Sequence, residues 1–173
     1  MKQLYAYDFD KTLIPYDSFR RYLWHLIRYR PFTICFLLLL RKLRIISSLE
    51  IKKSVTEMVA ASCVLQHDAK LFAQSIKKDI CWQNKHDEAT TLIITASPMI
   101  YMKYIVEDMS CEILCSDYIG GSYVEMYGDI KEKYLRAYYP TSMYQYAYAI
   151  SDSESDLCWM QKFNEYKMIN KKQ

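Results

Sequence analysis

The chain has 173 residues, a length that suits one domain or one catalytic domain with an insertion. Hydrophobic residues make up 51% and charged residues 25%, with only 3 Gly and 4 Pro, and this composition excludes disordered, collagen-like and low-complexity proteins. The formal net charge of +3 is too small to indicate a nucleic-acid partner, and the sequence has no Lys/Arg run with interleaved aromatic residues.

The first predicted element is a short strand that ends in acidic residues. Residues 4–9 are apolar and aromatic apart from Asp8, and Asp10 follows directly. From Asp17 the hydrophobic period changes to that of an amphipathic helix, with Asp17 and Ser18 as candidate N-caps. The chain is predicted to stay helical to about residue 88, with further helices that begin at Pro31, after Ser47 and Ser48, and at Asp68.

An alternation of strands and helices follows this helical segment. Strands are predicted at 91–95, 111–115, 144–150 and 166–169, helices at 98–109, 131–138 and 153–162, and a small hairpin at 119–127 around Gly120 and Gly121. This order predicts an α/β fold, a mostly parallel sheet flanked by helices, with an all-helical cap inserted after the first strand. We assign residues 1–16 and 89–173 to the catalytic core and residues 17–88 to the cap. Sites in such sheets lie at the carboxyl ends of the strands.

Two acidic residues end the first strand in the sequence DFDKTL. Asp8 and Asp10 are two residues apart, so both side chains can point to the same side, where one phosphate could meet both carboxylates. One carboxylate can attack phosphorus as a nucleophile while the other donates a proton. A strand that ends in solvated acids is the alternative interpretation.

Hydroxyl groups and a basic residue follow two later elements. In ITASP, Thr95 and Ser97 lie just before a helix, where hydroxyl and N–H groups suit an anion, although both residue types are also common helix caps. Lys131 begins a helix and could neutralise phosphate oxygens. Lys133 competes for this role, and a solvated surface lysine is the alternative.

A further acidic motif, SDSESD, follows the strand that ends at Ile150. Asp152 and Asp156 are four residues apart, so on a helix both can face one hard cation. Mg2+, bound by carboxylates, water and a substrate phosphate, is the expected ion. Acidic residues that cap a helix and oppose its dipole are the alternative.

In their order along the chain, DFDKTL, TAS, the stretch Gly128–Lys131 and SDSESD resemble motifs one to four of the haloacid dehalogenase (HAD) superfamily, over residues 5–169. The helical insertion between motifs one and two is similar to the phosphoserine-phosphatase-like branch. Residues 16–40, with the later TASP and SDSESD, are similar to the phosphatidylglycerophosphatase C type and its relatives. The resemblance implies a Rossmann-like core with a helical cap and a HAD-type phosphomonoester phosphatase that uses Mg2+. Lys11 and Ser151 stand where glycine is common in that superfamily, and neither difference removes a reacting group.

The resemblance also implies a role for each motif residue. Asp8 would be the nucleophile that forms an aspartyl phosphate, and Asp10 the general acid and base. The phosphate would be bound by Thr12, Thr95, Ser97 and Lys131. The metal would be held by Asp8, the backbone carbonyl of Asp10 and Asp152, with Asp156 in support.

The first half of the cap is strongly basic. Between Ser18 and Lys53 nine Lys and Arg residues stand against one acid, Glu50, and the apolar run from Phe32 to Leu40 lies among them. Such a surface attracts anions and could lie on an anionic membrane, presenting a phospholipid headgroup to Asp8. The alternative is that the run packs in the cap's own core or in a dimer interface. It is too short to span a bilayer, which needs about 20 apolar residues.

Two classes of function are open at this point. The first is magnesium-dependent hydrolysis of a phosphate monoester, on either a phospholipid headgroup or a phosphorylated small molecule, and the second is a phosphate- or metal-binding module without turnover. Six scattered Cys without a CxxC pair disfavour a zinc site. With a start that lacks an apolar signal segment, they indicate a cytoplasmic protein, on the inner face of the membrane if the cap binds lipid. No nucleic-acid partner is expected, and the sequence predicts no oligomeric state.

Overall fold

Six strands form one sheet in the computed structural model, which describes residues 1–82 and 88–169. Their order is β4-β3-β2-β1-β5-β6, and neighbouring strands are parallel except β3 and β4. The strands are β1 (Lys2–Tyr7), β2 (Thr90–Pro98), β3 (Glu112–Ile119), β4 (Ser122–Val124), β5 (Tyr144–Ser151) and β6 (Glu165–Met168). The predicted α/β fold with a mostly parallel sheet is confirmed.

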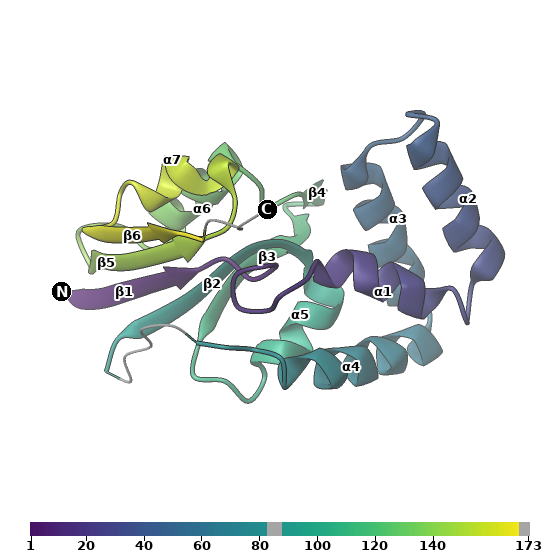
Figure 1. Cartoon of the computed structure of the whole chain (residues 1–173), viewed down its shortest axis with the longest axis horizontal. Helices are drawn as coiled ribbons and strands as arrows, with labels where there is room; N and C mark the ends of the chain where they lie inside the picture. The colour runs from purple at the N-terminus through teal and green to yellow at the C-terminus, as the bar shows by residue number, and fades with distance from the viewer. Residues whose placement is uncertain (83–87, 170–173) are drawn as a thin grey trace.

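The strand β1 lies inside the sheet between β2 and β5, and both of its faces are covered (Figure 1). Leu4 and Ala6 pack with residues of α6 (Asp129–Tyr138) and α7 (Leu157–Met160). Tyr5 and Tyr7 pack on the other face, in the cluster that includes α5 (Met99–Val106). Burial on both faces holds β1 in place, so the loop that follows it starts from a fixed point at the end of the sheet.

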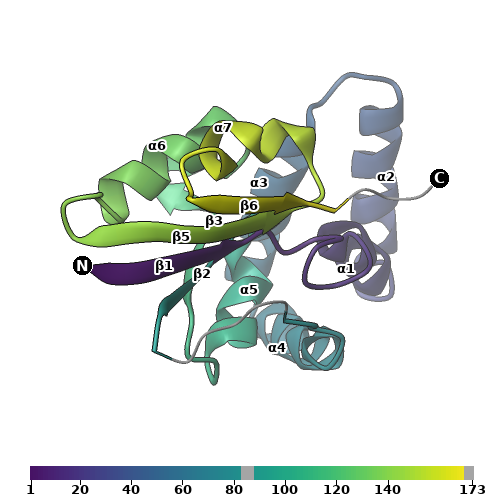
Figure 2. The same cartoon turned by 60° about the vertical axis from the view of Figure 1, so that its left-hand side comes forward.

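Between β1 and β2 the described residues form four helices, which we call the cap. They are α1 (Ser18–Leu26), α2 (Pro31–Lys42), α3 (Ser48–Ala60) and α4 (Cys63–Lys77). Figures 1 and 2 show them beyond the end of the sheet to which β1 and β5 point. Aromatic rings join cap and core. The ring centroid of Tyr22 in α1 lies 4.9 Å from that of Phe72 in the cap helix α4 and 5.1 Å from that of Tyr101 in the core helix α5. These helices confirm the predicted helical insertion, but α4 ends at Lys77 and not near residue 88, and residues 83–87 of the predicted cap lie outside the described residues.

The residues predicted as caps start the first and third of these helices. The carboxylate of Asp17 accepts a hydrogen bond from the Arg20 N–H at 2.8 Å. At α3 the Ser47 hydroxyl accepts from the Glu50 N–H at 3.2 Å, while Glu50 accepts from the Ser47 N–H at 2.6 Å. This reciprocal pair is a capping box, and it engages the carboxylate of Glu50 within the helix terminus.

Several predicted boundaries were wrong. The first strand ends at Tyr7, so Asp8 lies in the following loop, and β3 continues to Ile119 and forms one arm of the predicted hairpin. The helix predicted to begin at Asp68 begins five residues earlier, because Ser62 caps it by accepting from the Leu65 N–H. The helix predicted over 153–162 is a 3-10 turn at Glu154–Asp156 followed by the short α7.

The apolar helix α2 is packed on one side only. Ile34 is buried and Leu37 and Leu38 are half-buried against the core cluster, whereas Phe32 is 90% exposed and Phe36 59% exposed. One side of the run thus packs in the cap, as the first alternative expected, and the side with Phe32 and Phe36 does not. Among the helices of residues 1–82 and 88–169, none has the length and apolar character needed to cross a bilayer.

Candidate active site

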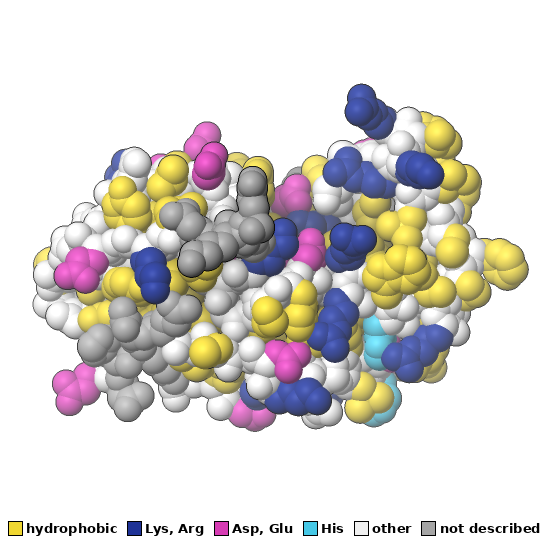
Figure 3. Space-filling model, in the orientation of Figure 1, with side chains coloured by type: hydrophobic (Ala, Val, Ile, Leu, Met, Phe, Trp, Pro, Cys, Tyr) yellow, Lys and Arg dark blue, Asp and Glu magenta, His cyan; other side chains and the backbone are white. Residues whose placement is uncertain are grey.

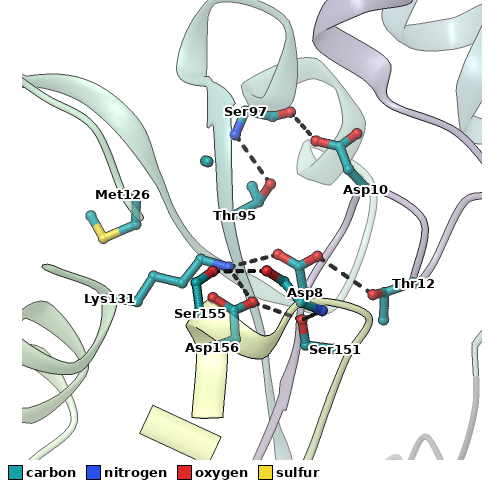
Figure 4. A network of polar contacts seen from close by, with 12 residues as sticks. Asp8, Asp10, Thr12, Thr95, Ser97, Met126, Lys131, Ser151, Ser155 and Asp156 are labelled. Atoms are coloured by element: carbon teal, nitrogen blue, oxygen red, sulfur yellow. Dashed lines mark hydrogen bonds and ion pairs between the residues drawn. The ribbon is translucent and has the colours of Figure 1, made fainter. Parts of the chain in front are cut away.

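Polar side chains from four separate elements meet at the carboxyl end of the sheet (Figure 4). Asp8 follows β1, Thr95 lies near the end of β2, Lys131 is in the first turn of α6, and Asp152 follows β5. These elements are neighbours in the sheet or cover it, so residues up to about 150 positions apart in the sequence come together. The sequence placed each of these residues at an element end, and the structure brings them to one place.

The centre of the site is a buried ion-pair cluster around Lys131. The Lys131 ammonium lies 2.7 Å from Asp8 Oδ1 and 2.7 Å from Asp156 Oδ2. Lys131 is 2% exposed, Asp8 6% and Asp156 1%. The Ser151 hydroxyl donates a further hydrogen bond of 2.7 Å to Asp156. Buried charges need such partners, so Lys131 and not the exposed Lys133 is the lysine of this site.

The buried surroundings of the cluster shift the pKa values of Asp8 and Lys131. Burial raises the pKa of Asp8 to about 7, although the ammonium group of Lys131 acts in the opposite direction. Burial also lowers the pKa of Lys131, but the charges of Asp8 and Asp156 outweigh it, and the pKa of Lys131 is raised. Lys131 therefore stays positively charged at neutral pH.

Asp10 is held by donors from the cap and from β2. Its Oδ1 accepts a hydrogen bond of 2.6 Å from the backbone N–H of Ser18, and its Oδ2 accepts one of 2.6 Å from the Ser97 hydroxyl. The Ser18 hydroxyl lies 2.9 Å from Ser97 Oγ and 2.9 Å from the Tyr101 hydroxyl. Burial raises the pKa of Asp10, and the hydrogen bonds from Ser18 and Ser97 oppose this rise.

Thr12 links the loop after β1 to the loop after β5. Its hydroxyl lies 3.4 Å from Asp8 Oδ2 and accepts a hydrogen bond of 3.1 Å from the Asp152 N–H. Lys11, which stands where the superfamily commonly has glycine, has a φ of 59°. Glycine adopts that left-handed conformation without steric cost, so Lys11 occupies a backbone position that favours glycine.

The predicted site residues divide between two adjoining cavities. A cavity of about 120 Å3 is lined by the larger group, which comprises Asp8, Asp10, Thr95, Lys131, Asp152 and Asp156. Ser97 lines the other cavity, and its hydroxyl is engaged by Asp10. Thr12 lines neither of these two cavities and contacts Asp8. The phosphate contacts of Thr12, Thr95, Ser97 and Lys131 stay predictions.

The spacing argument for Asp152 and Asp156 was wrong. Asp152 precedes the 3-10 turn, so the two residues do not lie one turn apart on an α-helix. Asp156 points inward to Lys131 and Ser151, whereas Asp152 is partly exposed at the cavity wall. Support of a metal by Asp156 stays a prediction, and the contacts described here make it a partner of the lysine.

Oxygen ligands at this edge suit a hard cation such as Mg2+. Asp8, Asp10 and Asp152 line one cavity, and Thr12 ties Asp152 to Asp8 through the two hydrogen bonds given above. In the part of the chain that the structure describes, no three Asp, Glu, His or Cys side chains are grouped so that they could hold a metal ion. The residues fit an ion held by two carboxylates, a backbone carbonyl and oxygens of water or substrate, and not one enclosed by side chains.

A larger cavity, of about 340 Å3, lies between cap and core beside Asp10. Lys52 of α3 lines it and donates hydrogen bonds of 2.9 Å to the Ala96 carbonyl and 2.6 Å to Glu125. Ala96 lies between Thr95 and Ser97, so the cap holds the predicted phosphate-binding segment directly. The other lining residues are Asp10, Asp17, Phe19, Ser48, Ser97 and Tyr127.

Sequence reasoning missed Lys52, Glu125 and Ser18. A signal for Lys52 exists, because it falls at helical spacing with the buried Thr56 and next to Ile51, on the inward face of α3. Its partner Glu125 could not be found in this way, since it lies outside regular structure and 73 residues away.

The chain resembles known proteins in sequence and in fold. The family model described as haloacid dehalogenase-like hydrolase matches residues 6–161. A protein of unknown function from Bordetella pertussis Tohama I has a similar structure, with a TM-score of 0.67 and 14% identity over 96% of this chain and 89% of that one. A phosphoserine phosphatase in its apo form is also similar, with a TM-score of 0.53 and 12% identity over 96% of this chain and 85% of that one. At such identities the two structures bear on the fold alone. No curated protein matches the chain in sequence.

Proposed function

The chain belongs to the haloacid dehalogenase-like hydrolase family, and from this membership we propose that it hydrolyses a phosphate monoester with Asp8 as the nucleophile. The observation that carries the proposal is the buried contact of 2.7 Å between Asp8 and Lys131, at the wall of a cavity that Asp10 also lines. A carboxylate beside a fixed ammonium group can approach a phosphate, because the cation offsets the repulsion between the two anions.

Two in-line displacements would complete the reaction. In the first, an oxygen of Asp8 attacks phosphorus, the bond from phosphorus to the leaving oxygen breaks, and Asp10 gives its proton to that oxygen. In the second, water attacks the phosphorus of the aspartyl phosphate and gives a proton to Asp10. The bond between phosphorus and Asp8 breaks, which releases phosphate and restores the carboxylate of Asp8.

The surroundings of Asp10 suit both of its proposed protonation states. Burial favours the protonated form that the first displacement needs, and the hydrogen bonds from Ser18 and Ser97 favour the carboxylate that the second needs. Ser18 is also the first residue of α1, so the orientation of the acid depends on the position of the cap.

We propose Mg2+ as the cofactor. Asp8 and Asp152 would hold the ion with the backbone carbonyl of Asp10, and water and a phosphate oxygen would complete its shell. When bound, it would neutralise charge on the phosphate and on the nucleophile. Asp156 would act indirectly, because its carboxylate holds Lys131 in place against Asp8.

The larger cavity offers room for the leaving group. Its volume of about 340 Å3 is near the lower end of the range for small-molecule pockets. A phosphorylated small molecule would fit inside, whereas a phospholipid would enter with its headgroup only. Phe19 and Tyr127 supply apolar contact area, and Lys52 and Ser48 supply polar groups. These residues favour a small leaving group with both apolar and polar parts.

A phosphate-release screen tests the proposal. Soluble phosphomonoesters and vesicles of phospholipids with a terminal phosphate monoester would be compared, each with Mg2+ and with a chelator. We expect hydrolysis only with Mg2+, and a higher Mg2+ requirement for Asp152→Asn. Glu154→Gln is the matched control, because Glu154 is exposed and outside the cavity that Asp152 lines.

The outcomes separate the open alternatives. Full hydrolysis in chelator would reject the role of the metal. Phosphate binding by the native chain without hydrolysis of any ester would favour a non-catalytic module. Hydrolysis of the lipid substrates alone would assign the phospholipid headgroup as the substrate class.

A further inference from the structure

The outer side of α2 presents a row of apolar side chains to solvent. Phe32, Phe36, Leu39 and Leu43 are 90%, 59%, 52% and 60% exposed. Their spacing of four, three and four residues puts them on one face of the helix. In Figure 1 α2 lies at the edge of the molecule with α3 between it and the core, and in Figure 3 hydrophobic side chains gather at this edge. Apolar surface in such a row indicates an interaction site.

Basic side chains stand at both ends of this row. Arg30 precedes α2, and Arg41, Lys42 and Arg44 surround Leu43 at the other end of the row, all of them exposed. In the described ranges none of these four forms an ion pair with an acidic side chain. The single acid between Ser18 and Lys53, Glu50, is engaged in the capping box of α3. The charge of this edge is therefore positive and uncompensated.

We propose that this face of α2, defined by Phe32, Phe36, Leu39 and Leu43, binds the surface of an anionic lipid bilayer. The helix would lie in the plane of the interface, with its apolar row among the upper acyl chains and its flanking bases among the headgroups. Twelve residues give α2 a length of about 18 Å, which suits this position and not a bilayer span.

Charge favours a bilayer over a second copy of the chain as the partner. A symmetric dimer through this face would bring the basic residues of both copies together, and like charges in one interface oppose association. An anionic lipid surface instead offers negative charge along both ends of the row. Binding needs no catalysis, so the proposal stands apart from the proposed phosphatase activity.

Co-sedimentation with vesicles tests the proposal directly. The whole chain would be mixed with vesicles of phosphatidylcholine alone or of phosphatidylcholine with phosphatidylglycerol, at about 0.1 M and about 1 M NaCl. We expect binding to the anionic vesicles at low salt, and weak binding at high salt or without the anionic lipid. Arg41→Gln with Lys42→Gln should weaken binding about fivefold per base removed.

Matched variants separate the α2 face from general surface effects. Phe36→Ser with Leu39→Ser should abolish binding, whereas Val64→Ser with Leu71→Ser should not, because Val64 and Leu71 are exposed apolar residues on α4. Lys70→Gln with Lys103→Gln is the control for the change of charge, since both lysines are exposed and lie on α4 and α5. Far-UV circular dichroism would verify that each variant is folded.

Three results would overturn the proposal. The first is an absence of binding to anionic vesicles at low salt. The second is equal binding by the native chain and by Phe36→Ser with Leu39→Ser. The third is a dimer in sedimentation velocity that this same pair of substitutions dissociates, which would assign the face to self-association.

Discussion

Lys131 and the bases beside α2 carry the same charge in opposite surroundings. Lys131 is 2% exposed and has two carboxylates at 2.7 Å, whereas Arg41 and Lys42 are exposed at the edge of the cap. A buried charge is stable only with its partners, so the position of Lys131 is fixed by the fold. An exposed charge is not fixed in this way, and its role depends on what approaches it. We therefore expect substitutions in the two regions to have very different effects on activity and stability.

The largest effect is expected for Asp8→Asn. An amide cannot form the acyl phosphate, so turnover should fall by roughly 10^4-fold or more while the fold is retained. Hydrolysis of a soluble phosphomonoester measures the loss. Asp108→Asn is the control, because Asp108 is an exposed acid that lines neither of the two cavities. Retention of most activity by Asp8→Asn would mean that another residue is the nucleophile.

Lys131→Met should damage stability as well as activity. It leaves Asp8 and Asp156 buried without their cation, at a cost of about 3–5 kcal/mol in the free energy of unfolding. Lys133→Met, two residues away and exposed, should cost less than about 0.5 kcal/mol. Urea unfolding of both variants makes the comparison. Equal stability of the two would show that the buried cluster contributes little to folding.

The cost of Lys131→Met should also depend on pH. Burial raises the pKa of Asp8 to about 7 although the charge of Lys131 opposes this rise. Loss of Lys131 should therefore raise the pKa of Asp8 further. Above pH 7 the folded variant would then bind more protons than the folded native chain, and its relative stability should fall as pH rises. Unfolding in chelator at several pH values measures this. If the difference in the free energy of unfolding between the native chain and the variant narrows above pH 7, this assignment of the pKa shift is wrong.

Much of the fold and part of the site followed from the sequence. The change of hydrophobic period at Asp17 located the helical insertion, and acidic residues after apolar strands located Asp8, Asp10 and Asp152. The residues alone left Lys131 and Lys133 both open, and only the family resemblance favoured Lys131, because the choice depends on which lysine the tertiary structure buries. The inward turn of Asp156 was missed for a similar reason, since the 3-10 turn that orients it has no distinct hydrophobic period.

The exposure of α2 could not be predicted from the sequence either. A helix that is apolar on every side is typical of a buried helix, and the run from Phe32 to Leu40 has this character. Whether such a helix is covered depends on its neighbours. Here α2 packs against its cap neighbours α1 and α3 on one side, and only Ile34 is fully buried.

Lys52→Met should have an intermediate effect. Its ammonium group donates to the Ala96 carbonyl and to Glu125, which join the cap to the segment after Thr95. Loss of these contacts should lower the free energy of unfolding by about 1–3 kcal/mol and reduce kcat/KM, because the cavity wall moves. Lys53→Met is the matched control, since Lys53 is the next residue on α3 and is exposed. An unchanged kcat/KM in Lys52→Met would limit its role to folding.

The smallest effect on stability is expected for Phe36→Ser with Leu39→Ser. These side chains are 59% and 52% exposed, so each substitution should change the free energy of unfolding by less than about 0.5 kcal/mol. Truncation of a covered leucine or phenylalanine costs about 2–5 kcal/mol, which makes the two cases easy to distinguish. Ile34→Ala on the buried side of the same helix is the control and should show that larger cost. A large loss in the Ser variant that depends on protein concentration would mean that a second copy covers this face in solution. A small loss at every concentration would leave the apolar row free for a lipid surface.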